Sequence, residues 1–237
     1  MHKFFRIMAV ILNIETSTDV CSAALTAEGM VLCHYEDFQG RNHAALLSGF
    51  VKKCLDHARD HEIDLEAVAV SIGPGSYTGL RIGLSEAKGL AYALDIPLIG
   101  VSTLQLLAVS AMFGSADLDP DCLLAPMIDA RRMEVYTAVY NFGLEEIMKP
   151  QALILDENSY AAELASHQVI FMGNGSGKAS GVITSPNATF LPDIVPLASD
   201  MLALAERAYA RRDFLDLAYS VPTYLKDFQA TKPKKLI

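Results

Sequence analysis

The chain has 237 residues, of which 51% are apolar and 20% are charged, and its formal net charge is −9. A chain of this length forms one large domain or two small ones, and it buries enough surface to need no disulfide or structural metal. The acidic balance argues against a protein that grips nucleic acid or an anionic membrane by itself, because such binding depends on Lys and Arg contacts to phosphate.

The cysteines and the apolar runs indicate where the protein resides. The four cysteines stand singly, with no C-x-x-C pair, so the sequence encodes neither a zinc ribbon nor a redox pair, and we expect buried thiols in a reducing compartment. The apolar run at 7–12 is short and has no cleavage site after it, so it reads as a strand and not as a signal peptide. No run approaches the ~20 residues of a membrane span. We therefore expect a cytoplasmic protein without membrane contact.

The first half of the chain predicts strands and helices in the order βββαβαβα. Strands are expected at 8–14, 20–27, 30–37, 68–72 and 97–101, and helices at 42–60, 80–94 and 103–112. Glu28-Gly29 is a tight hairpin signal between the second and third strands. A hairpin meander followed by crossover helices indicates an α/β fold with a mixed sheet covered by helices.

A polar, turn-rich segment at 114–121 separates this part from the rest of the chain. Beyond it we expect a hairpin at 123–128 and 134–140, a helix at 157–165, a strand at 169–172, a loop at 173–190 and a helix at 200–212. The predicted domains are therefore 8–113 and 122–237.

Two polar loops follow buried strands in the first domain. The segment from Gly73 to Gly79 precedes and begins a helix, and its backbone amides could bind an anion. Alternatively, it could be a turn of unusual backbone conformation that lets the helix pack closely on the rest of the domain. The segment from Glu15 to Asp19 could hold a hydrated Mg²⁺ or a phosphate, or it could be a turn that bonds its own backbone. The candidate nucleotide or phosphate residues are Glu15, Thr16, Ser17, Gly73, Gly75 and Ser76.

Small residues recur every four positions on the second predicted helix. They are Gly79, Gly83, Ala87 and Ala91. Such a ridge lets another helix or a sheet approach closely, and that packing must offset about 1 kcal/mol lost per glycine relative to alanine. The spacing alone does not decide whether the ridge meets the chain's own sheet or a partner.

Two further motifs lack residues that a metal site or a P-loop requires, although 173–178 could still form a Gly-rich edge of a ligand cleft. His57 and His61 lie one helical turn apart, but no third metal ligand is evident, so no metal site is predicted. The segment from Gly173 to Lys178 looks like a phosphate loop, yet Met172 and Ala179 stand where that loop needs Gly and Ser or Thr.

Six blocks, in the same order along residues 8–140, resemble the bacterial TsaB (YeaZ-type) family. They are Ile11–Thr18, Arg41–His43, Ser71–Gly83, Ala87–Ala91, Val101–Leu104 and Met127–Arg131. The block from Ser71 to Gly83 is the most specific. The second half of the chain is similar only in outline and length.

The resemblance implies a two-lobed actin-like ATPase fold (ASKHA type, with ribonuclease-H-like lobes). It implies a non-catalytic subunit that pairs with a TsaD-type transferase, with a TsaE-type ATPase, for N6-threonylcarbamoylation of adenosine 37 in ANN-decoding tRNAs. It also implies a homodimer when the subunit is alone, and tRNA contact only through other subunits. No cofactor is expected on the chain itself, and ATP with Mg²⁺ is expected only at the assembled complex. Older naming of the wider family is glycoprotease.

The resemblance also implies which helices meet the partner. In the catalytic paralogue an H-x-x-x-H metal motif follows the strand that matches 97–101, whereas 101–107 here has no histidine. Under the resemblance the partner-facing alternative is favoured for the small-residue ridge. The expected interface residues are Arg41, Asn42, His43, Leu46, Phe50, Gly79, Gly83, Ala87 and Ala91. The alternatives are a stand-alone ATP-dependent enzyme that uses the two polar loops and, more poorly, a metallopeptidase.

Overall fold

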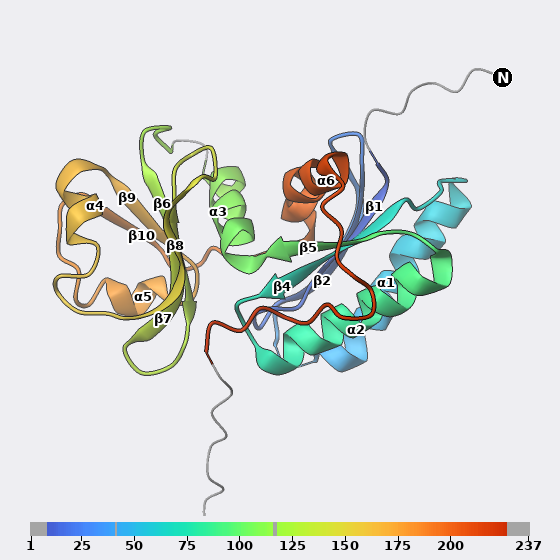
Figure 1. The fold of residues 1–237 in the computed structure, drawn as a ribbon, viewed down its shortest axis with the longest axis horizontal. Helices are drawn as coiled ribbons and strands as arrows, with labels where there is room; N and C mark the ends of the chain where they lie inside the picture. Colours follow the sequence, from blue (N-terminus) through green and yellow to red (C-terminus); the bar gives the residue numbers. More distant parts are fainter. Residues whose placement is uncertain (1–8, 41, 116–117, 227–237) are drawn as a thin grey trace, which may run out of the picture.

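The structure is a computed structural model that describes residues 9–40, 42–115 and 118–226. Figure 1 shows two sheets side by side, each flanked by helices. The elements are β1 (Ile11–Glu15), β2 (Cys21–Ala27), β3 (Met30–Asp37), α1 (His43–Asp60), β4 (Ala67–Gly73), α2 (Tyr77–Leu94), β5 (Leu98–Ser102), α3 (Thr103–Gly114), β6 (Leu123–Asp129), β7 (Glu134–Tyr140), β8 (Glu146–Ile154), α4 (Ala161–Ser166), β9 (Val169–Met172), α5 (Ser176–Ala179), β10 (Ala188–Leu191), η1 (Ala198–Met201) and α6 (Leu202–Arg211).

The two sheets have the same topology. The first has the order β3-β2-β1-β4-β5, and the second, taken from β8, has the order β8-β7-β6-β9-β10. In each sheet the hairpin strands pair antiparallel and the remaining strands pair parallel. The predicted α/β class and the two-lobed fold with mixed sheets are therefore confirmed.

The central strands of the first sheet are buried on both faces. On β1, Leu12 and Ile14 contribute to the core under α1 and α2, whereas Ile11 faces the core under α6. Val68 and Ala69 on β4 divide between the two cores in the same way. Side chains of a strand alternate between faces, so an apolar run with no polar alternation marks a strand covered on both sides.

Helix α3 lies between the two sheets (Figure 1). Leu106 and Val109 belong to a core of the first lobe, whereas Leu104 and Leu107 pack with residues of the second sheet. A helix that is apolar all round is buried all round. The helix therefore joins the lobes through apolar packing on both of its sides.

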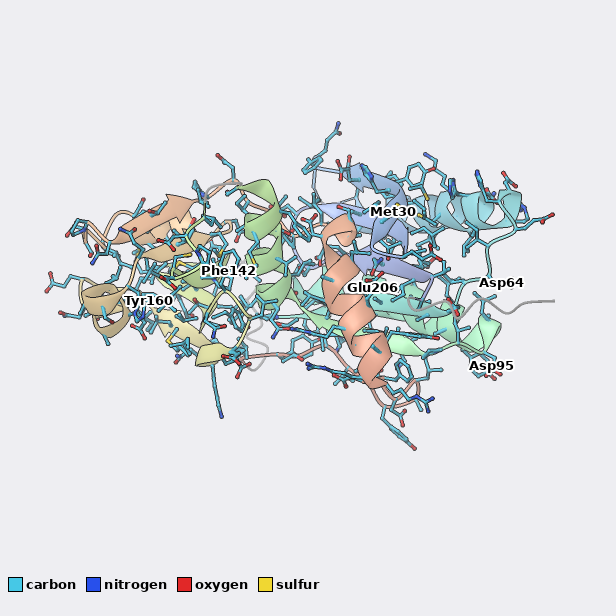
Figure 2. All side chains as sticks on the ribbon, turned by 90° about the horizontal axis from the view of Figure 1, so that it is seen from above. Met30, Asp64, Asp95, Phe142, Tyr160 and Glu206 are labelled. Atoms are coloured by element: carbon cyan, nitrogen blue, oxygen red, sulfur yellow. The ribbon has the colours of Figure 1, made fainter. Side chains whose placement is uncertain are left out.

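The second predicted domain, 122–237, is too long, and this boundary is corrected. Leu204 on α6 packs with Ile11 of the first sheet, and the Gly29 amide donates to Glu206 Oε1 at 3.0 Å. Figure 2 shows Glu206 on α6 close to Met30 of the β2–β3 hairpin. The chain thus returns to the first lobe from η1 onward, because that sheet still has an uncovered apolar face.

The segment 213–226 then crosses the first lobe, and we call it the C-terminal strap. The Leu215 amide donates to Leu98 O at 2.8 Å, and the Thr223 amide donates to Ile72 O at 2.7 Å. At its end, Lys226 Nζ lies 2.6 Å from Glu134 Oε2 of the second lobe. The strap therefore ties the two lobes together.

Other differences from the predicted elements are local. Strand β8 was not predicted, because it is a largely exposed edge strand that contains Pro150. The predicted loop 173–190 contains α5 and the start of β10, and the predicted helix 200–212 begins as a 3-10 turn. All four cysteines are free, and Cys33 is the only one that is not fully buried. No helix among the described residues is long and apolar enough to cross a membrane.

Candidate partner interface

The two predicted polar loops meet in the structure. The Ser76 amide donates to Ser17 O at 2.7 Å, and Thr16 Oγ1 donates to Gly79 O at 2.8 Å. Glu15, Thr16 and Ser17 are at most 1% exposed. Strand β1 ends at the first loop and α2 begins in the second, so the parallel pairing of β1 with β4 brings them to one sheet edge.

This junction is filled by the chain's own atoms. A Cβ on Gly75 would lie 2.9 Å from Ser17 Cβ, and a Cβ on Gly73 would lie 2.7 Å from the Thr223 carbonyl oxygen. Gly73 has φ +111°, which side chains rarely adopt. The geometry therefore favours close seating of α2 over the phosphate site that was predicted at Glu15, Thr16, Ser17, Gly73, Gly75 and Ser76.

The small-residue ridge faces inward, and its predicted role is corrected. A Cβ on Gly79 would overlap the Thr16 carbonyl oxygen, and one on Gly83 would overlap Thr16 Oγ1. Ala87 and Ala91 are fully buried in the first-lobe core. The ridge meets the chain's own turn and sheet, so these four residues present no surface to a partner.

The predicted α1 residues are only partly placed on the surface. Arg41 lies outside the described residues. Asn42 is exposed just before α1 but makes no side-chain cap, and His43 is buried with Nε2 at 2.9 Å from Thr18 O. Leu46 is half-buried, and Phe50 stacks on Tyr35 with ring centroids 6.3 Å apart. The predicted set therefore lies mostly on the inner side of its helices.

The outer side of the same two helices carries a groove of about 420 Å³. The residues that line it are Ala44, Leu47, Ser48, Tyr77, Thr78, Arg81, Ile82, Ser85 and Glu86. Ser48 Oγ donates to Glu86 Oε2 at 3.1 Å, which links α1 to α2 beside the groove. None of these residues was predicted. The available signal was the spacing of Tyr77, Arg81 and Ser85 four residues apart on one face of α2.

The C-terminal strap holds one end of this groove. Arg81 Nε donates to Tyr224 Oη at 3.2 Å, and the Tyr77 and Tyr224 ring centroids lie 5.3 Å apart. The Arg81 guanidinium carbon lies 4.2 Å from the Tyr77 ring centroid. Tyr224 thus orients an aromatic and a cationic side chain of the groove. Lys88 Nζ secures the strap on the same helix by donating to Ala218 O and Ser220 O.

Burial gives Glu15 an unusual carboxyl group. Desolvation raises the pKa of Glu15 to about 7, against opposing hydrogen bonds from Ser17, Ser71 and Thr16. In the unfolded chain the carboxyl titrates near its ordinary value of 4.5. The proton is therefore bound more tightly in the folded state. Its stabilising contribution is complete below pH 4.5 and is lost as the pH rises through about 7.

We expect Glu15→Gln to remove this pH dependence. The amide is neutral at every pH, so the variant gains up to about 3 kcal/mol of stability relative to the parent between pH 5 and pH 8. Thermal unfolding of both proteins at the two pH values measures the change. Glu157→Gln, at an exposed position, serves as the control and should follow the parent. Parallel profiles for parent and Glu15→Gln would contradict the account of this junction.

The two rejected motifs have structural roles. His57 and His61 are stacked at the end of α1, with ring centroids 4.2 Å apart. Lys178 Nζ donates to Arg132 O and Glu134 O and pairs with Asp129, so it braces the β6–β7 hairpin. Among the described residues, no three His, Cys, Asp or Glu side chains are grouped closely enough to hold a metal ion.

A protein family, individual relatives and solved structures all show similarity between this chain and the same group of proteins. Residues 36–236 match the family described as TsaD, tRNA N6-adenosine threonylcarbamoyltransferase. The chain is 32% identical to the tRNA threonylcarbamoyladenosine biosynthesis protein TsaB of Escherichia coli (strain K12), over 94% of this chain and 96% of that protein. It is 35% identical to the protein of the same name in Bacillus subtilis (strain 168), over 69% of this chain and 70% of that protein.

The fold agrees with these sequence matches. YeaZ from Pseudomonas aeruginosa superposes with a TM-score of 0.78 at 30% identity, over 92% of this chain and 100% of that one. The likeness therefore extends over both lobes and is not confined to the first. With the duplicated sheet topology, it confirms the two-lobed actin-like fold. The chain belongs to the TsaB (YeaZ) family, within the wider group that the TsaD family describes.

Proposed function

We propose that this chain is the non-catalytic subunit of a tRNA threonylcarbamoyladenosine-forming complex and that it activates a TsaD-type transferase by pairing with it. The observation that carries the proposal is the open groove between α1 and α2 on a member of the TsaB family. In the cytoplasm, this subunit would support modification of adenosine 37 in ANN-decoding tRNAs.

The groove has the composition of a docking site. Ala44 and Ile82 supply apolar surface, Tyr77 supplies an aromatic ring, and Arg81 and Glu86 supply charges of opposite sign. Interfaces concentrate binding energy in such aromatic and Arg side chains around an apolar centre. A helix from the partner would bury this surface and pair with the charges.

The proposal assigns no catalytic residue to this chain. The two loops that could have held a phosphate fill each other, as Gly75 against Ser17 illustrates. We therefore place ATP and Mg²⁺ at the assembled complex, where a TsaE-type ATPase would join. The same groove would accept a second copy of the chain when the transferase is absent.

A reconstituted reaction tests this function. The assay contains the transferase of the same organism, the enzyme that forms the threonylcarbamoyl donor, the TsaE-type ATPase and an unmodified tRNA transcript. It is run with and without this chain. We expect threonylcarbamoyladenosine in the digested tRNA only when the chain is present. Product formation without it would contradict the proposal. Turnover of Mg-ATP by the isolated chain would favour the stand-alone enzyme.

Tyr224 offers a milder test of the groove. We expect Tyr224→Phe to weaken binding of the transferase about two- to fivefold, because it removes one hydrogen bond that orients Arg81. Titration calorimetry measures the dissociation constant. Tyr219→Phe removes a hydroxyl from the same strap at a position that is 85% exposed, and it should leave affinity unchanged. Equal effects of the two variants would contradict the positioning role.

A further inference from the structure

The turn between β6 and β7 has an uncommon backbone. Arg131 has φ 71° and Arg132 has φ 51°, so two successive residues with side chains adopt the left-handed region. Gly adopts such turns at lower cost because it has no Cβ, and Asn and Asp do so because their side chains hydrogen-bond the local backbone. A strained conformation on two bulky residues points to a role that requires those side chains.

Hydrogen bonds and an ion pair with neighbouring residues stabilise the turn. The Arg131 amide donates to Asp129 Oδ1, and Asn174 Oδ1 accepts the Asp129 amide at 2.9 Å. Lys178 pairs with Asp129 and also donates to the Arg132 carbonyl oxygen at 2.7 Å. The hairpin is therefore held in one conformation. This lowers the entropic cost of ordering the turn when a ligand binds.

The charges on this hairpin do not balance. Its two carboxylates are already paired, Asp129 with Lys178 and Glu134 with Lys226. The side chains of Arg131 and Arg132 are exposed, and neither guanidinium makes a hydrogen bond or ion pair with any other residue that the structure describes. An acidic protein thus presents two adjacent, unpaired guanidinium groups on a rigid turn.

We propose that this turn binds the phosphodiester backbone of the tRNA in the assembled complex, an inference that rests on the proposed function. A guanidinium is planar, permanently charged and matched to two oxygens of a phosphate, and adjacent arginines can contact one or two successive phosphates. This chain would then touch tRNA directly at one point, in contrast to the expectation of purely indirect contact. The remaining tRNA affinity would come from other subunits.

The double variant Arg131→Gly/Arg132→Gly separates binding from folding. Glycine adopts positive φ freely, so the variant should fold with a melting temperature equal to or above that of the parent. We expect the complex with the transferase to form with unchanged affinity but to bind an unmodified ANN-decoding tRNA transcript about tenfold more weakly. The slope of log K against log salt should fall in magnitude by about 1.5, for two lost phosphate contacts.

A matched control removes the same charge elsewhere. Arg211→Ala/Arg212→Gly deletes two arginines at the end of α6, where Arg212 also has positive φ, and should bind tRNA like the parent. Unchanged tRNA affinity and salt slope in the hairpin variant, or an equal loss in the control, would overturn the inference. Loss of transferase binding by the hairpin variant would also overturn it, since the turn would then contact a protein.

The same series distinguishes this inference from the proposed function. Association of the unaltered chain with the transferase is measured first, and its absence would remove the proposed function. The tRNA comparison is then made with the isolated chain, parent against both double variants, at low salt. Weaker binding by the hairpin variant alone would still support the phosphate site, and equal binding by all three would remove it.

Discussion

Replacing Gly79 with alanine is expected to destabilise the protein by about 3 kcal/mol, although alanine favours a helix. The added Cβ would overlap the Thr16 carbonyl oxygen, which is backbone in a buried turn and cannot rotate away. For a chain of this length the change corresponds to a fall of roughly 6–12 °C in melting temperature. Calorimetry or urea unfolding measures it.

Gly89 provides the matched control on the same helix. A Cβ at Gly89 would meet no atom within 4 Å, so Gly89→Ala should stabilise the protein by about 0.5–1 kcal/mol. If Gly79→Ala proved as stable as Gly89→Ala, α2 would not be seated on the Thr16 turn as the structure has it. We therefore expect the two substitutions, on one helix, to change the free energy of unfolding in opposite directions.

The inward ridge also changes how the interface has to be tested. Leucine at Gly83 and Ala87 would force bulk into the buried contact with Thr16 and into the first-lobe core. Such a variant would lose its fold, and loss of partner binding would then say nothing about the interface. Substitutions in the exposed groove avoid this difficulty.

Ala44→Arg is the corresponding test of the groove. Ala44 is exposed in the first turn of α1 and lines the groove, so the fold should tolerate arginine there. A long charged side chain in the groove would hinder a partner helix, and we expect affinity for the transferase to fall at least about thirtyfold, or ~2 kcal/mol. Titration calorimetry or sedimentation with the purified transferase measures this loss.

Ala162→Arg is the control for that substitution. Ala162 is an exposed residue in the first turn of α4, in the second lobe, so the added charge and helical position are alike. Its affinity for the transferase should equal that of the parent. A similar loss in both variants would indicate a general effect of charge and would remove the groove from the interface.

Local patterns predicted much of the fold. The predominantly apolar sequences of β1 and β4 reflect burial on both faces, and Glu28-Gly29 forms the hairpin with both residues at positive φ. Strand β8 was missed, because its apolar residues do not follow its burial: Ile147 and Ile154 are exposed, and Pro150 stands at a half-buried position. The packing of α6 on the first lobe was also missed, since the pattern of an amphipathic helix does not specify which of two sheets the helix covers.

The sequence predicted which helices form the candidate site, but it did not predict which face of each helix is exposed to a partner. Four-residue spacing shows that Gly79 and Gly83 share a ridge, but both a partner and the chain's own turn satisfy that spacing. The contact between Arg81 and Tyr224 joins residues 143 positions apart, so no local pattern contains it. Such information lies in tertiary packing and becomes available only with the structure.

The central claim is that this chain acts by binding the transferase through the α1/α2 groove. The most direct test is the yield of threonylcarbamoyladenosine in the reconstituted reaction as the concentration of the chain is raised, for the parent and for Ala44→Arg. We expect the variant to need at least about thirtyfold more protein for half-maximal yield and to reach the same plateau, since only affinity is altered. An unchanged midpoint, or a lowered plateau at saturating protein, would contradict the claim.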